Sequence, residues 1–163
     1  MKAIDKISIA KIMILKKKDE YGYFVDNSKM HRVTKIPTMG VSILASGIHI
    51  FYNEEFVERL TVKEVAGVLL HEYDHVLMDH LERIKKYDNW EQDKHTHNVA
   101  MDLIINQYND WLPEVGVTLE GVREQLGLDL EPRSSYEYYY KMLKPVMQER
   151  KMERGENADE HEV

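Results

Sequence analysis

Two histidines and a glutamate near the middle of the chain have types and spacing that suit metal-assisted hydrolysis. They lie in the segment His71-Glu72-Tyr73-Asp74-His75. Residues four apart on an α-helix lie one turn apart on the same face, so both imidazoles can bind one metal ion. Glu72 can then reach a water molecule bound at that ion. This HExxH pattern supplies the two ligands and the general base of zinc metalloproteases.

The surrounding sequence predicts one helix from Thr61 to His80. Thr61 and Glu64 have the spacing of a capping box, in which each side chain binds a backbone amide of the first turn. Apolar residues then recur at helical spacing and predict a face packed on the core, opposite the histidines: Val62, Val65, Ala66, Leu69, Leu70, Tyr73, Val76 and Leu77. Gly67 lies toward the histidine side, where the missing side chain lets another segment approach.

A catalytic zinc ion usually takes three protein ligands, and two residues are candidates for the third. His80 follows His75 closely, but on a continuous helix it points about 180° away from His71. Asp102 lies in a second predicted helix, on a polar stripe formed by His95, Asn98, Asp102, Asn106 and Asn109. Spacing alone does not separate this stripe from a solvated helix face. We favour Asp102 because the stripe carries Asn, His and Asp in place of the usual Lys and Glu, and we retain His80 as the alternative.

Composition narrows the function further. The chain has 163 residues, no cysteine and a formal net charge of -7. Without cysteine, a metal site must use His and carboxylates. The negative charge argues against nucleic-acid binding, and no apolar run approaches the ~20 residues of a membrane span. We therefore expect a cytoplasmic protein with neither a nucleic-acid nor a membrane partner.

The remaining segments predict a mostly helical chain with a small sheet. An amphipathic helix is expected at the N-terminus, with Ile4, Ile7, Lys11 and Ile14 on one face. Residues 41–44 and 48–52 predict two strands around a turn. Further helices are expected over 94–109, over 118–126 and from a capping box at Ser134 to about Pro145. Residues 146–163 are charged and predict a flexible tail.

At these motifs the chain resembles a bacterial and phage family of predicted metal-dependent peptidases whose larger members carry a von Willebrand factor A-like domain. The resemblance rests on Gly47–Phe56, on Leu69–His80 and on Asn98–Asn106, and covers most of residues 1–145. It implies an α+β, zincin-like fold with the small sheet beside the HExxH helix. It also implies zinc on His71 and His75, Glu72 as the base and Asp102 as the third ligand, and it includes His80.

The function expected from these observations is zinc-dependent hydrolysis of peptide bonds by a domain at residues 1–145, acting on a peptide or protein substrate. The strand at Ile48–Tyr52 could pair with an extended substrate, and His95 or Tyr73 could stabilise the oxyanion. Two alternatives stay open. One is a zincin-like binding or regulatory module whose metal is structural or absent, and the other is a metal hydrolase acting on a non-peptide bond. The sequence specifies no protein partner.

Overall fold

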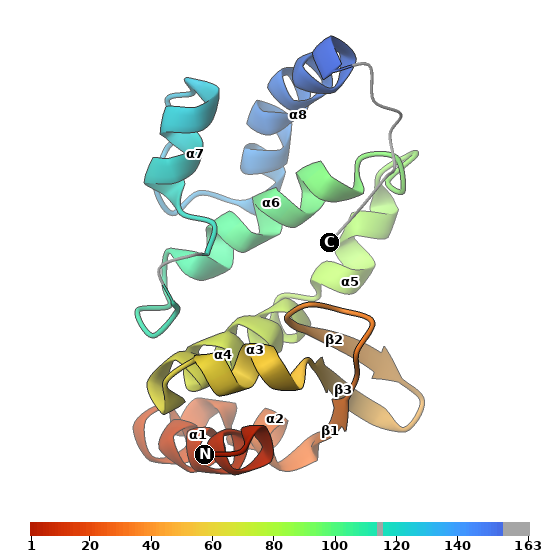
Figure 1. Cartoon of the computed structure of the whole chain (residues 1–163). Helices are drawn as coiled ribbons and strands as arrows, with labels where there is room; N and C mark the ends of the chain where they lie inside the picture. The colour runs from red at the N-terminus through yellow and green to blue at the C-terminus, as the bar shows by residue number, and fades with distance from the viewer. Residues whose placement is uncertain (114–115, 155–163) are drawn as a thin grey trace. The chain divides into compact units, whose positions relative to one another are not determined.

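The computed structural model describes residues 1–113 and 116–154, and they form two compact units. The first unit comprises Met1–Met78 and the segment that begins at Asn109. The second comprises Asp79–Tyr108 and the chain from Gly116 onward. The secondary structure is mostly helical with one small sheet, which confirms the α+β class (Figure 1). No helix among the described residues is long and apolar enough to cross a membrane.

The first unit places its helices around a sheet of three strands. Its helical elements are α1 (Ala3–Lys17), η1 (Asp19–Tyr21), α2 (Gly22–Asn27), α3 (Glu54–Arg59) and α4 (Val62–Leu77). The strands β1 (Ser28–Arg32), β2 (Met39–Leu44) and β3 (Gly47–Tyr52) lie in the order β1-β3-β2. Strand β3 runs parallel to β1 and antiparallel to β2.

The sheet confirms the two predicted strands but contradicts the substrate-pairing role predicted for the second. The predicted turn joins β2 to β3, and Gly47 adopts a φ of 118° there, a conformation that favours glycine. The parallel strand β1 was not predicted. Because β3 pairs with a strand on each side, Ile48–Tyr52 has no free edge, and the prediction that this strand pairs with substrate is wrong.

Helices α1 and α4 form much of the core of the first unit. Helix α1 confirms the predicted N-terminal helix and buries Ala3, Ile7, Ala10 and Ile14, although Ile4 is exposed. Helix α4 buries the predicted stripe from Val65 to Tyr73, whereas Leu77 at its end is exposed. These helices pack against each other and leave the opposite face of α4 to the histidines.

The second unit is formed by helices. They are α5 (His80–Arg83), η2 (Ile84–Lys86), α6 (Lys94–Asn106), α7 (Leu119–Leu126) and α8 (Tyr136–Arg154). Helix α7 matches its prediction, with a cap at Thr118 and a left-handed Gly127 after its last turn. Helix α6 ends at Asn106, three residues earlier than predicted.

Helix α8 differs from its prediction at both ends. Ser135, in place of Ser134, accepts the hydrogen bond from the amide of Tyr138, and Glu137 pairs with Arg83. The helix also continues through Pro145 to Arg154, so residues 146–154 are helical where a charged tail was expected. Residues 155–163 of that tail lie outside the described residues. The domain limits at 145 and 146 stay a prediction.

A buried histidine lies at the centre of the second unit. His97 is fully buried, its Nδ1 lies 2.6 Å from the Tyr136 hydroxyl, and its ring stacks on Tyr140 at 4.0 Å. Burial lowers the pKa of His97 to about 4, so its imidazole is neutral at pH 7. This histidine therefore serves the packing of α6 against α8.

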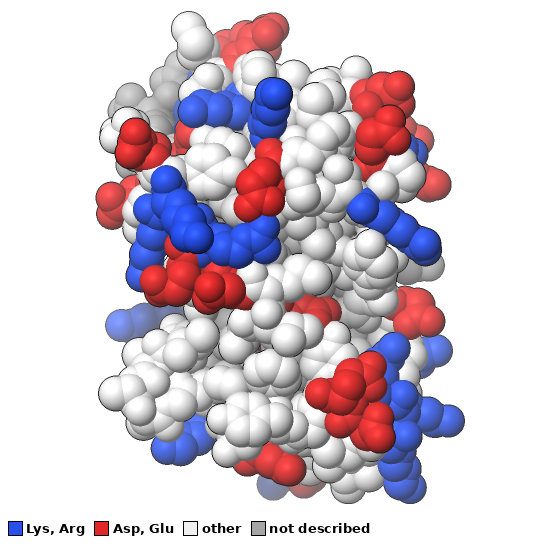
Figure 2. Space-filling model, turned by 180° about the vertical axis from the view of Figure 1, so that it is seen from behind, with Lys and Arg blue, Asp and Glu red and all other residues white. Residues whose placement is uncertain are grey.

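Charges of both signs are interspersed on the face drawn in Figure 2. The Lys and Arg side chains there form separate groups with Asp, Glu and uncharged side chains between them. With a net charge of -7, this face does not offer the continuous basic surface that nucleic-acid binding requires.

Candidate metal centre

Local capping and core packing determine where the HExxH helix begins and how it is rotated. The capping box is formed as predicted: the Glu64 amide donates to the Thr61 hydroxyl at 3.1 Å, and Glu64 accepts from the Thr61 amide at 2.9 Å. Two residues after His71, Tyr73 is fully buried, its hydroxyl lies 2.7 Å from that of Ser28, and its ring stacks on Phe24. Since Tyr73 points into the core, the histidines on the opposite face of α4 point away from it.

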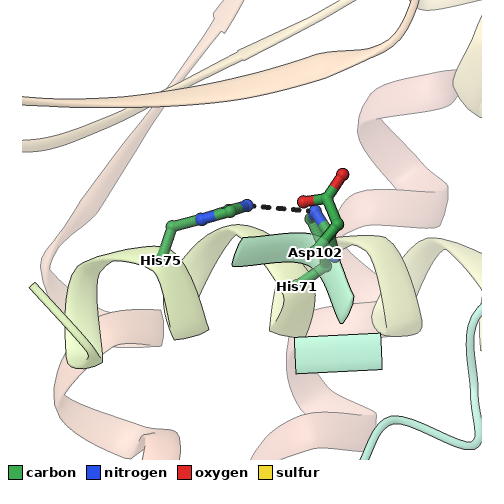
Figure 3. A group of neighbouring side chains, drawn as sticks. All are labelled: His71, His75 and Asp102. Atoms are coloured by element: carbon green, nitrogen blue, oxygen red, sulfur yellow. Dashed lines mark hydrogen bonds between the residues drawn. The ribbon is translucent and has the colours of Figure 1, made fainter. Parts of the chain in front are cut away.

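The two histidines of the motif approach each other closely. Their Nε2 atoms are 3.1 Å apart, and the rings meet at an interplanar angle of 82° with centroids 4.7 Å apart. Both side chains are half-buried. Figure 3 shows the imidazoles on neighbouring turns of α4 with their nitrogen atoms directed toward one region.

This geometry fits a shared metal ion. Two nitrogen ligands of a tetrahedral zinc ion, each about 2.0–2.1 Å from it, lie about 3.3 Å from each other. The observed separation of 3.1 Å is close to that value. The perpendicular rings also allow both Nε2 lone pairs to converge on one point beside the line that joins them. The two histidines therefore have a separation and orientation that could hold one metal ion.

The two carboxylates inside the motif have different surroundings. Glu72 is buried beside His71, with 8% of its surface exposed. Asp74 accepts a 2.5 Å hydrogen bond from the Tyr21 hydroxyl. Burial raises the pKa of the Asp74 carboxyl, and the bond from Tyr21 and the nearby His71 act in the opposite direction. Asp74 thus anchors α4 to the segment before α2, which leaves Glu72 as the acid–base candidate.

The helix ends earlier than predicted. Helix α4 stops at Leu77, Asp79 adopts a left-handed conformation with φ 58°, and His80 begins α5. No glycine or proline marks this break, but aspartate tolerates the left-handed region better than most residues. His80 is fully buried in the second unit, where its ring lies 5.7 Å from that of Tyr136. The expected core-facing position of His80 is found, although it follows from the helix break. Its role as a ligand stays a prediction.

The close approach predicted at Gly67 is present. A Cβ atom at this position would lie 2.3 Å from the backbone oxygen of Trp111, a distance that no side chain tolerates. The Asn109 side-chain amide also donates to the Gly67 carbonyl at 2.9 Å. The segment that follows α6 is therefore held against α4 one turn before His71, on the histidine face.

Asp102, the third predicted ligand, belongs to α6 in the second unit and is half-buried. The polar stripe that contains it is not a uniformly solvated face. Asn98 and Asn106 are also half-buried, and the Asn106 amide donates to the Val117 carbonyl at 2.8 Å, whereas His95 is exposed. Asp102 is drawn in Figure 3 with the two histidines. Its role as a ligand is part of the proposal below.

Sequence reasoning missed a second histidine cluster, on the sheet of the first unit. The His49 side chain was assigned no role, yet it is buried and lies between two partners. Its Nδ1 is 2.7 Å from Nε2 of His31, and its Nε2 is 2.7 Å from the Ser46 hydroxyl. The signal was absent from the sequence because the cluster depends on the pairing of β1 with β3.

Comparison with known proteins identifies the family. Residues 30–163 match the profile of a family described as "Putative metallopeptidase domain". The match covers more than half of the chain, and the chain belongs to this family, as the resemblance of its motifs predicted.

The chain was also compared with individual proteins and with solved structures. A protein of Thermotoga maritima, described as an uncharacterized protein, is 30% identical over 121 residues, which is 74% of this chain. The chain spans 30% of the length of that relative. No solved structure matches the chain.

Proposed function

We propose that the chain is a zinc-dependent peptidase whose metal is held by His71, His75 and Asp102. The observation that carries the proposal is the Nε2–Nε2 distance of 3.1 Å within an HExxH helix, in a member of a metallopeptidase family. Two imidazoles and one carboxylate are a common donor set for catalytic zinc, and they leave a further position for water.

Two observations support Asp102 as the third ligand: a contact made by the chain that follows α6, and the burial of the residues beside Asp102. Asn109 is seven residues after Asp102 and is bonded to Gly67, which is four residues before His71. This contact ties the end of the segment that carries Asp102 to the histidine face of α4. Asp102 also lies on a stripe whose neighbours Asn98 and Asn106 are half-buried.

The residues of α4 divide the chemistry between them. Zinc bound here would polarise the scissile carbonyl and lower the pKa of a water molecule toward about 7. Glu72 follows His71 directly, so its carboxylate would accept the proton of the attacking water and pass it to the leaving amine. Tyr73 cannot supply an oxyanion donor, because it is buried on the opposite face and bonded to Ser28. His95, on the exposed side of α6, stays a candidate for that role.

The sheet suggests how substrate binds. Strand β2 packs against α4 and pairs with β3 on one side only among the described strands. An extended peptide can add to such an edge through main-chain hydrogen bonds. We therefore expect unfolded polypeptide as the substrate, with its backbone paired to Met39–Leu44.

The central test is the Glu72→Gln variant. We expect wild-type protein to bind about one zinc ion and to cleave an unfolded protein, and Glu72→Gln to reduce the rate by about 10²–10⁴-fold because the general base is lost. The variant should retain its zinc, measured by elemental analysis. Asp74→Asn is the matched control, since Asp74 faces Tyr21. Unchanged activity in Glu72→Gln rules out the hydrolase. If wild-type protein instead hydrolyses a substrate from a screen of esters and amides, and Glu72→Gln loses that activity, the protein is a hydrolase of non-peptide bonds.

The third ligand has its own test. Asp102→Ala should lose bound zinc, whereas His80→Phe should retain it while keeping the packing against Tyr136. Anomalous scattering at the zinc edge would locate the ion directly. A zinc ion bound to His80 in that experiment would replace Asp102 in the ligand set.

A further inference from the structure

An apolar stripe runs along the outer face of α1. Ile4 is 47% exposed and Ile12 is 53% exposed, with Leu15 also exposed near the end of the helix and Met1 just before its start. At about 100° per residue, Ile4, Ser8, Ile12 and Leu15 fall within roughly 80° of arc. The inner face of the same helix carries Ile7 and Ile14 and packs on α3 and α4, which lie on that side of α1 in Figure 1. Helix α1 is therefore apolar on two faces, and only one is covered within the described chain.

The central residues of the outer stripe are spaced symmetrically, so this part of the stripe has the same pattern when the helix is read in either direction. Ser8 lies at its centre, Ile4 and Ile12 lie one turn to either side, and Leu15 lies two turns after it. A two-fold symmetric interface places the same patch of two copies face to face in opposite directions. Centred on Ser8, such a pairing puts Ile4 against Ile12 of the second copy and places Leu15 near the start of the second helix. The small Ser8 side chain at the crossing allows the two helices to approach closely.

Charges along one border of the stripe agree with this pairing. Asp5 and Lys16 are both exposed and lie within roughly 20° of each other around the helix. In the antiparallel pair, the same border of each copy lies together. A lysine side chain on a helix leans toward the helix N-terminus, so Lys16 of the second copy extends toward Asp5. Symmetry gives this opposite-charge pair twice.

We propose that the outer face of α1 is a homodimer interface, formed by antiparallel pairing of two copies about Ser8. The apolar stripe alone covers on the order of a few hundred Å², less than the ~800 Å² per partner of a standard interface. The dimer therefore dissociates at micromolar concentrations. The pairing lies on the face of α1 opposite α4, so it leaves the histidine face of α4 accessible.

Sedimentation velocity of the full chain over a range of micromolar concentrations tests the proposal. Wild-type protein should show a reversible monomer–dimer equilibrium. Ile12→Glu should stay monomeric throughout, because each substitution places two charges in the interface. Ile9→Glu is the matched control: Ile9 is 42% exposed on the same helix but lies roughly 100° from the stripe centre, and this variant should dimerise as wild type does.

Charge reversal gives a second, independent readout. Asp5→Lys should weaken the dimer, and the double variant Asp5→Lys with Lys16→Asp should restore it. Circular dichroism and thermal melting confirm that each variant is folded, and Ile4→Glu replaces Ile12→Glu if the latter unfolds. A wild-type chain that is monomeric at every concentration overturns the proposal. A dimer disrupted by Ile9→Glu and not by the stripe variants also overturns it.

Discussion

Two histidine pairs in the first unit have similar distances between their nitrogen atoms but different angles between their rings. His71 and His75 meet at 3.1 Å with rings at 82°, whereas His31 and His49 meet at 2.7 Å with rings at 20°. The nearly coplanar rings of the second pair meet end to end, with centroids 4.9 Å apart, so a ring N–H of one points directly at a nitrogen of the other. That pair is joined by a hydrogen bond. The first pair is also within hydrogen-bonding distance, but its perpendicular rings would let both Nε2 atoms approach one metal ion.

The difference follows from the elements that carry the residues. His71 and His75 are four apart on one helix, so their side chains leave the backbone in similar directions and converge beside it. His31 and His49 lie on neighbouring parallel strands, where His49 is paired with Lys29 and His31 with Phe51. Their side chains are therefore two residues out of direct register, and the rings meet diagonally across the two strands. The two pairs therefore differ in the angle between their rings more than in the distance between their nitrogen atoms.

The largest expected effect is on zinc binding. His71→Ala should lower zinc affinity by more than about 100-fold, since changing even an outer partner of a ligand costs about 10–100-fold. His49→Ala should leave the affinity unchanged, because its nitrogens serve His31 and Ser46. Titration calorimetry with zinc measures both variants. Equal loss of zinc in the two would erase the distinction between the pairs.

A smaller effect is expected where α4 meets the segment after α6. Gly67→Ala should lower the free energy of unfolding by about 1–3 kcal/mol, because the new methyl group forces the Trp111 backbone to move. Gly22→Ala is the control, since the nearest atom to its Cβ would be Leu15 Cδ2 at an ordinary 3.7 Å. Urea unfolding of both variants measures the difference. A wild-type stability in Gly67→Ala would show that this contact is not tight.

The smallest expected effect is the pH dependence contributed by the hydrogen-bonded pair. Burial, His31 and Lys29 all lower the pKa of His49 below the usual 6.5. The unfolded chain then binds a proton that the folded chain resists, so stability falls as pH drops below about 6.5. His49→Gln should reduce this slope between pH 7 and pH 5, measured by urea unfolding at each pH. An unchanged slope would remove His49 from the acid response.

Much of the candidate site could be predicted because it lies on one helix. The Thr61–Glu64 cap and the buried side of α4 both follow from side chains within a few turns of one another. The approach at Gly67 was predicted from the helix face, but the atoms that exclude a side chain there belong to the distant Trp111 backbone. The end of the helix could not be predicted in this way. Asp79 adopts the left-handed conformation at a position with no glycine or proline, and His80 is buried in the second unit.

The pairing of strands that are distant in the chain also could not be predicted from the sequence. Strand β1 pairs Ser28 with Ile48, twenty residues away, and no local pattern specifies that register. This pairing removes the free edge from β3, leaves β2 open on one side, and buries His49 against His31. Pro145 was read as a helix end, yet α8 continues through it, with Tyr136, Tyr139, Tyr140 and Leu143 buried before it.

The sequence by itself determined three features of α4: a histidine pair spaced to hold a metal ion, a neighbouring carboxylate and a capped helix that directs both histidines to one side. These properties depend on residue type and on the 3.6-residue period, both of which are local. Only the tertiary structure decided where that helix stops, which strand has a free edge and that His49 is hydrogen-bonded to His31 on the neighbouring strand. Those outcomes depend on contacts between residues distant in the chain, whose geometry no local spacing encodes.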